Sequence, residues 1–187
     1  MKSNHNTVKL ALTAAVSVFL ALNAPQAFAA GAHDDGHGKA SPTGKAGKAS
    51  DVTRTIKVMM GDNFYDMESL SVKGGETIRF QIKNTGSFVH EFSIGTKAMH
   101  AGHNKEMMRM MEHGALEADR INHDKMKMDM GGGKTMQHND PNSTLLEPGK
   151  SSEIIWNFPK DAVAELEFAC NVPGHYEAGM VGKVHFK

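Results

Sequence analysis

Short apolar runs separated by turn signals dominate the chain from Asp51 onward. In residues 77–82, apolar Ile78, Phe80 and Ile82 alternate with polar side chains, which is the period-two pattern of a half-buried strand. Glycine-rich turn signals separate such runs. The other predicted strands cover residues 52–60, 88–94, 152–158, 165–170 and 179–186. About seven short strands with regular turns predict an all-β fold, a β-sandwich of the Greek-key type.

One long segment, residues 96–139, breaks this pattern. It lacks valine, phenylalanine and tryptophan, but it holds nine of the 14 methionines and five of the 11 histidines. We therefore expect an insertion that forms no sandwich strand and supplies little core. From Asn104 to about Arg120, apolar residues recur at spacings of three and four, which predicts that part of the insertion is an amphipathic helix.

The N-terminal region carries targeting signals rather than fold signals. Residues 1–29 combine lysines, a short apolar run and a small-residue cleavage site, which together predict a secretory signal peptide. The apolar run is too short to span a bilayer. Residues 30–50 are rich in Gly, Ala, Lys and His and predict a flexible leader. We thus expect an exported, periplasmic protein without a membrane span, whose single domain covers residues 51–187.

Charge balance and cysteine count bear on two features, a nucleic-acid partner and a disulfide bond. The chain has 21 basic and 21 acidic residues, and this balance gives no reason to expect a nucleic-acid partner. Its one cysteine, Cys170, excludes an intramolecular disulfide even though an exported protein could form one.

The candidate chemistry lies on the last predicted loop. Cys170, His175 and Met180 follow one another with four residues in each gap, between two predicted strands. Singly, each has an ordinary explanation as a buried thiol, a turn histidine or a core methionine. Jointly, the spacing brings a thiolate, an imidazole and a thioether to one end of the sandwich, where His90 on a separate strand can add a second imidazole. One cysteine, two histidines and a weak methionine are the ligands of a blue-copper centre.

The insertion holds a second set of soft donors. Thioethers suit Cu(I), and imidazole suits copper in either oxidation state. A competing explanation is that a methionine stripe simply packs the helix against the sandwich. The candidate secondary copper ligands are Met99, His100, His103, Met107, Met108, Met110, Met111, His113, His123, Met126, Met128, Met130, Met136 and His138.

The segments 86–92 and 170–180 resemble the two halves of a cupredoxin copper site. The resemblance spans residues 51–187, and with the insertion and signal peptide it is strongest to the periplasmic CopI-type copper-tolerance cupredoxins. It implies one type 1 copper bound by the four residues of the candidate site, and a role in surviving copper. Two positions depart from the wider family, because Glu91 and Asn171 replace the Asn and the Ser or Thr common there. Gly174 in place of a second cysteine excludes a dinuclear centre of the oxidase-subunit kind, which needs two bridging thiolates.

Three functions are compatible with this site. The first is copper tolerance, by binding copper or cycling it between Cu(I) and Cu(II). The second is an electron shuttle between respiratory redox partners, in which the insertion serves only for docking. The third, a copper enzyme, is disfavoured because the predicted sandwich has no second histidine-rich cluster. In the first two cases we expect His90 to be the buried imidazole and His175 to lie nearer the surface.

Overall fold

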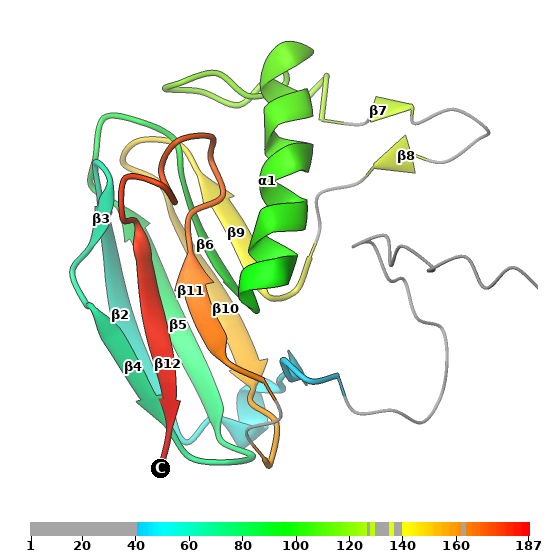
Figure 1. Ribbon diagram of the computed structural model, residues 1–187. Helices are drawn as coiled ribbons and strands as arrows, with labels where there is room; N and C mark the ends of the chain where they lie inside the picture. The colour runs from blue at the N-terminus through cyan, green and yellow to red at the C-terminus, as the bar shows by residue number, and fades with distance from the viewer. Residues whose placement is uncertain (1–40, 127, 130–134, 137–139, 162–163) are drawn as a thin grey trace, which may run out of the picture.

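The computed structural model is a two-layer β-sandwich with one long helix at its side (Figure 1). It describes residues 41–126, 128–129, 135–136, 140–161 and 164–187. The predicted all-β sandwich is confirmed. The predicted signal peptide, residues 1–29, lies outside the described residues.

The first sheet has five strands in the order β1-β10-β5-β2-β3. Neighbouring strands are antiparallel except for the parallel pair β2 and β5. Their bounds are Lys45–Ala46 for β1, Arg54–Gly61 for β2, Phe64–Tyr65 for β3, Thr77–Asn84 for β5 and Ser151–Asn157 for β10.

The second sheet has the order β4-β12-β11-β6-β9, with β4 and β12 parallel. Its strands are Ser69–Val72 (β4), His90–Gly95 (β6), Ser143–Leu146 (β9), Leu166–Ala169 (β11) and Val181–Phe186 (β12). The remaining elements are the 3-10 helix η1 (Ala49–Asp51), the helix α1 (Lys97–Glu112) and a small pair of strands, β7 (Met128–Asp129) and β8 (Thr135–Met136).

The core lies between the sheets, as the period-two pattern predicts. Ile78, Phe80 and Ile82 of β5 are almost fully buried. Phe80 meets Phe92 of the opposite sheet with ring centroids 5.3 Å apart, and Phe92 stacks on Phe168 at 5.7 Å. These aromatic contacts tie β6 and β11, the two strands that lead to the candidate ligands, to the centre of the sandwich.

The domain begins earlier than predicted. Lys45 of β1 pairs with Asn157 of β10, and the indole N–H of Trp156 donates to the carbonyl of Thr43 at 2.9 Å. Lys45 and Ala46 therefore join the first sheet as β1, inside the segment for which the sequence predicted a flexible leader. Residues 30–40 of that predicted leader lie outside the described residues. A buried indole needs an acceptor for its N–H, and this backbone carbonyl supplies it.

Helix α1 is shifted toward the N terminus relative to the prediction of residues 104–120. It begins at Lys97 because the hydroxyl of Thr96 caps it, accepting the backbone N–H of Met99 at 3.3 Å. It ends at Glu112, before Gly114, whose φ of 67° continues the chain out of the helix.

The insertion contributes to the core, contrary to the expectation that it would supply little. Met107 and Met110 of α1 are buried, as are Ala115, Leu116 and Ile121 in the turns that follow. Because the flexible side chain of methionine can fill irregular gaps in a core, a segment without valine or phenylalanine can still pack against the sandwich.

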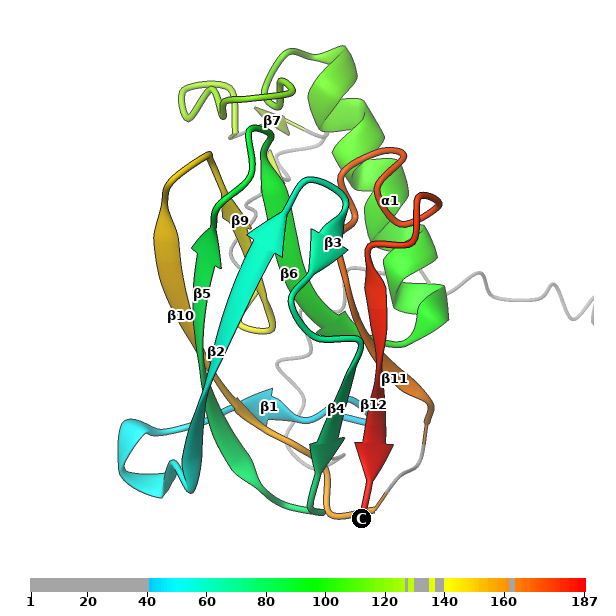
Figure 2. The ribbon, with the colours of Figure 1, turned by 90° about the vertical axis from the view of Figure 1, so that its left-hand side faces the viewer.

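Helix α1 lies beside the second sheet, next to β6 and β11 (Figures 1 and 2). All six residues of β6 are buried, because one face meets the other sheet and α1 covers the opposite face. Residues 170–180 form the loop between β11 and β12, called the ligand loop below. This loop and the start of β6 lie at the top of Figure 1, and the C terminus lies at the bottom.

Candidate metal centre

The donor atoms of His90, Cys170 and His175 converge at one end of the sandwich. The Nδ1 atoms of the two imidazoles are 3.2 Å apart, and Sγ of Cys170 lies 3.4 Å from Nδ1 of His175. One ligand atom from each residue falls within 4.8 Å of the others. Among the residues that the structure describes, this is the one cluster of at least three His, Cys, Asp or Glu side chains that could hold a metal.

The ligand loop is held in shape by its own backbone. The N–H of His175 donates to the carbonyl of Val172 at 3.0 Å, and the N–H of Met180 donates to the carbonyl of His175 at 2.9 Å. The N–H of Cys170 closes the loop on the carbonyl of Met180 at 3.1 Å. Gly174, with φ at 86°, makes the turn that an L side chain would strain. The three residues predicted as ligands are thus parts of one compact turn.

The four candidate ligands differ in burial, and the two histidines differ as predicted, with His90 the more buried. His90, Cys170 and Met180 are fully buried, whereas His175 is partly exposed. Met180 belongs to the same loop and lies in the core cluster with Cys170. One imidazole edge is therefore open to solvent, while the thiol is shielded from it.

The protonation chemistry of these side chains fits a soft metal ion. Burial raises the pKa of the Cys170 thiol to about 12 and lowers the pKa of His175, which also faces His90. Two imidazole nitrogens that face each other at 3.2 Å cannot both carry protons without repulsion. A metal ion coordinated by both Nδ1 atoms and by the deprotonated thiol would remove this repulsion and would stabilise the thiolate.

Asp62, which sequence analysis did not identify, contacts His90 at the ring nitrogen that does not face His175. Its Oδ1 atom lies 3.0 Å from Nε2 of His90 and accepts the backbone N–H groups of Ser87 and Phe88 at 2.8 and 3.2 Å. The hydrogen bond from His90 holds the pKa of Asp62 below its usual value. Asp62 stands in the β2–β3 turn, far from His90 in sequence, so no spacing rule could have found it.

The backbone of Glu91 contacts the thiol directly. Its N–H donates to Sγ of Cys170 at 3.3 Å, and its carbonyl accepts the hydroxyl of buried Tyr65 at 2.6 Å. Such hydrogen bonds to a ligand sulfur stabilise the thiolate and tune the metal that it binds. Tyr65 thereby holds the strand that presents this N–H group.

The described secondary candidates in the insertion differ widely in burial. On α1, His100, Met107 and Met110 are buried, His103 is mostly buried, and Met99, Met108 and Met111 are exposed. His113 and His123 are exposed, and Met126 packs partly against the core. Met128 and Met136 lie in β7 and β8, whereas Met130 and His138 lie outside the described residues. Copper binding by this set stays a prediction.

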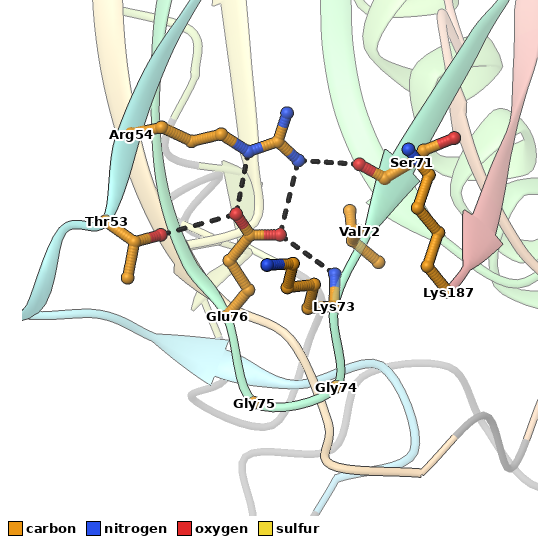
Figure 3. Close-up of a pocket in the computed structure, with 9 residues that line it drawn as sticks. All are labelled: Thr53, Arg54, Ser71, Val72, Lys73, Gly74, Gly75, Glu76 and Lys187. Atoms are coloured by element: carbon orange, nitrogen blue, oxygen red, sulfur yellow. Dashed lines mark hydrogen bonds and ion pairs between the residues drawn. The ribbon is translucent and has the colours of Figure 1, made fainter.

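A surface depression at the opposite end of the sandwich has a different character (Figure 3). Arg54 donates from Nε to Glu76 at 2.7 Å and from a terminal nitrogen to the carbonyl of Ser71 at 2.6 Å. Glu76 also accepts the backbone N–H of Lys73 at 2.9 Å. These charges satisfy one another and hold the turn between β4 and β5, so this depression is no candidate site.

The chain matches a known family and known relatives. The model of the copper-binding proteins of the plastocyanin/azurin family matches residues 52–187. The "copper-resistant cuproprotein CopI" of Pseudomonas aeruginosa is 46% identical over 154 residues, covering 79% of this chain and 83% of the relative. The protein of that name in Rubrivivax gelatinosus is 38% identical over 156 residues, covering 83% and 78%.

Solved structures agree in fold. Dithionite-reduced auracyanin from the photosynthetic bacterium Roseiflexus castenholzii has a TM-score of 0.50 at 26% identity, covering 73% of this chain and 98% of auracyanin. Auracyanin B, at 18% identity, has a TM-score of 0.53 and covers 79% and 96%. No helix among the described residues is long and apolar enough to cross a membrane. The chain belongs to the plastocyanin/azurin family of copper-binding proteins and is a cupredoxin of the CopI type.

Proposed function

We propose that the chain binds one copper ion through His90, Cys170, His175 and Met180 as a type 1 centre. The observation that carries this proposal is the convergence of two imidazoles on the buried thiol. Two imidazoles, a thiolate and a weak thioether suit both Cu(II) and Cu(I), so bound copper would supply one-electron chemistry with little rearrangement of its ligands. The protein's part is to orient the imidazoles and to shield the thiolate from water.

In this proposal the protein acts in the periplasm and contributes to copper tolerance by binding or redox-cycling copper. Two relatives that share most of their length with this chain are named copper-resistant cuproproteins. The predicted signal peptide, residues 1–29, supports export.

An electron shuttle between periplasmic redox partners is the second candidate. It is favoured by one observation, namely that His175 is partly exposed while the other three candidate ligands are fully buried. An exposed imidazole edge gives electrons a short path between the metal and a docked protein. A shuttle needs only one copper ion, whereas a protein that sequesters copper gains from additional sites.

Within the described part of the insertion, the exposed thioethers of α1 are the best placed to collect Cu(I). Met99, Met108 and Met111 are 38%, 47% and 40% exposed. Deleting residues 96–139 would also uncover the core that Met107 and Met110 fill, so substitution is the cleaner test. Replacing the three exposed methionines by leucine should lower the number of Cu(I) ions bound, while Met59→Leu, an exposed methionine outside the insertion, should not. Equal stoichiometry in all variants would favour the shuttle.

The type 1 centre itself is tested by the visible absorption spectrum as Cu(II) is added to the protein. We expect an intense thiolate-to-copper band that saturates near one equivalent and is absent in Cys170→Ser. A wild-type protein without this band would refute the type 1 centre and leave only the insertion as a copper site.

A further inference from the structure

Helix α1 and the candidate copper ligands meet at one buried carboxylate. The side chain of Glu91 is 1% exposed. Its Oε1 atom accepts hydrogen bonds from Nε2 of His103 at 2.9 Å and from the hydroxyl of Ser143. Its Oε2 atom accepts the backbone N–H of Asn171 at 3.2 Å and the side-chain amide at 2.8 Å. Glu91 therefore joins the residue after the cysteine to the helix of the insertion.

This carboxylate is attached to the backbone that contacts the thiol. The N–H of Glu91 donates to Sγ of Cys170, and Asn171 is the residue next to that cysteine. Anchoring the Glu91 side chain at β9, at α1 and at Asn171 consequently fixes the N–H group that faces the sulfur. The two departures from the wider family, Glu91 and Asn171, are thus partners of each other.

His103 supplies the positive charge for this carboxylate. Its side chain is 13% exposed, and its Nδ1 atom lies 3.2 Å from a carboxylate oxygen of Glu106. With a carboxylate at each ring nitrogen, both nitrogens act as donors, which is the hydrogen-bonding state of an imidazolium. Burial would lower the pKa of His103, but Glu91 and Glu106 raise it to about 10. Without a cation, a carboxylate as buried as Glu91 would be costly to keep ionised.

We infer that His103 and Glu91 are positioning residues through which helix α1 sets the environment of the Cys170 thiolate. In this role His103 is the counter-ion of the Glu91 carboxylate, and it does not bind copper. This inference rests on the proposed type 1 centre at Cys170. An unpaired carboxylate near the metal would stabilise Cu(II) more than Cu(I), and a displaced N–H would weaken the hydrogen bond to sulfur. Both effects lower the reduction potential.

Redox titration of the copper-loaded protein tests the inference, with the thiolate-to-copper band recorded alongside. His103→Gln should lower the reduction potential and shift the band, with the number of bound copper ions unchanged. Lys105→Gln, which removes an exposed positive charge from the same helix, should alter neither the potential nor the band. An unchanged potential and band in His103→Gln would overturn the inference. So would the loss of one bound copper ion with an unchanged band, because His103 would then be a ligand.

Two further variants distinguish a specific effect of the Glu91 interactions on the Cys170 thiolate from a general perturbation of the fold. In the double variant Glu91→Gln/His103→Gln both charges are absent, and the potential should return toward the wild-type value. Ser143→Ala removes a neutral donor from the same carboxylate and should lower the potential by less than His103→Gln does. It keeps the test available if His103→Gln does not fold, and an unchanged potential in Ser143→Ala would count against the inference. A wild-type protein without the band would refute the type 1 centre itself, whereas a normal wild-type band that no variant alters would refute only the role of the helix.

Discussion

The Nε2 atom of His90 lies 3.0 Å from Oδ1 of Asp62, a residue 28 positions earlier in the chain. The same carboxylate oxygen accepts two backbone N–H groups from the loop that leads into β6. Asp62 therefore fixes both the loop and the imidazole ring. With Nε2 engaged in this way, Nδ1 of His90 is the nitrogen that faces His175. Carboxylates that hold a ligating histidine in this manner set its orientation and increase its basicity.

Replacing Asp62 by alanine should weaken copper binding. Loss of such an outer partner typically costs about 10-fold to 100-fold in metal affinity. Competition with a copper chelator would measure the change, and Asp62→Asn, which keeps an oxygen acceptor, should lose less affinity. Asp124→Asn, at an exposed position, is the control. Wild-type affinity in Asp62→Ala would show that the loop holds His90 without the carboxylate.

Gly86 makes room for this contact. A Cβ atom on Gly86 would collide with Oδ1 of Asp62 and would lie 3.0 Å from Nε2 of His90. We expect Gly86→Ala to shift the band of the copper-loaded protein and to lower the free energy of unfolding by about 1–3 kcal/mol. Denaturant unfolding and the absorption spectrum check both effects. Ser87→Ala, at an exposed neighbouring position, should resemble wild type, and equal behaviour of the two variants would contradict the prediction.

Two adjacent methionines of α1 should differ sharply in their effect on stability. Met107 is fully buried, whereas Met108 is 47% exposed. Met107→Ala leaves a cavity and should cost about 2–5 kcal/mol of unfolding free energy, while Met108→Ala should change it by less than about 0.5 kcal/mol. Urea denaturation of the copper-free protein measures both. Similar losses in the two variants would mean that α1 does not pack as described.

The ion pair of His103 should make stability depend on pH. The pKa of His103 is raised from 6.5 to about 10 in the folded protein. Because the folded state holds this proton more tightly than the unfolded chain, the stabilisation is fully present below pH 6.5 and is lost as the pH rises toward 10.

The comparison that isolates this effect is copper-free wild type against His103→Gln. The wild type should be more stable by about 3 kcal/mol near pH 6, since removing one partner leaves a buried charge unpaired. The difference should shrink steadily between pH 6.5 and 10 in urea denaturation curves. A difference that stays constant over this range would mean that His103 stabilises the fold through packing alone.

Much of this protein follows from local sequence. The alternation of Ile78, Phe80 and Ile82 predicts a half-buried strand because side-chain direction in a strand has period two. The spacing of Cys170, His175 and Met180 predicts a shared site because a short loop between two strands keeps its residues together. Both inferences depend on neighbours in the chain. The structure contains the predicted strand, and it brings Sγ of Cys170 and Nδ1 of His175 within 3.4 Å of each other, while a metal site that includes Met180 stays a prediction.

The helix boundaries and the role of the insertion needed the tertiary structure. The methionine pattern indicated a helix, but it could not decide between a stripe that packs and a stripe that binds metal. That choice depends on which face meets β6 and β11, and the structure buries Met107 and Met110 while leaving Met108 and Met111 exposed.

The surroundings of the site were also beyond the sequence. Asp62 meets His90, and His103 meets Glu91, only because β2, β6 and α1 are brought together at one end of the sandwich. Residue types and spacing along the chain determined which side chains are the predicted copper ligands. The packing of distant segments decided which carboxylates and amides hold those side chains, because hydrogen bonds across a fold depend on proximity in space rather than on order in sequence.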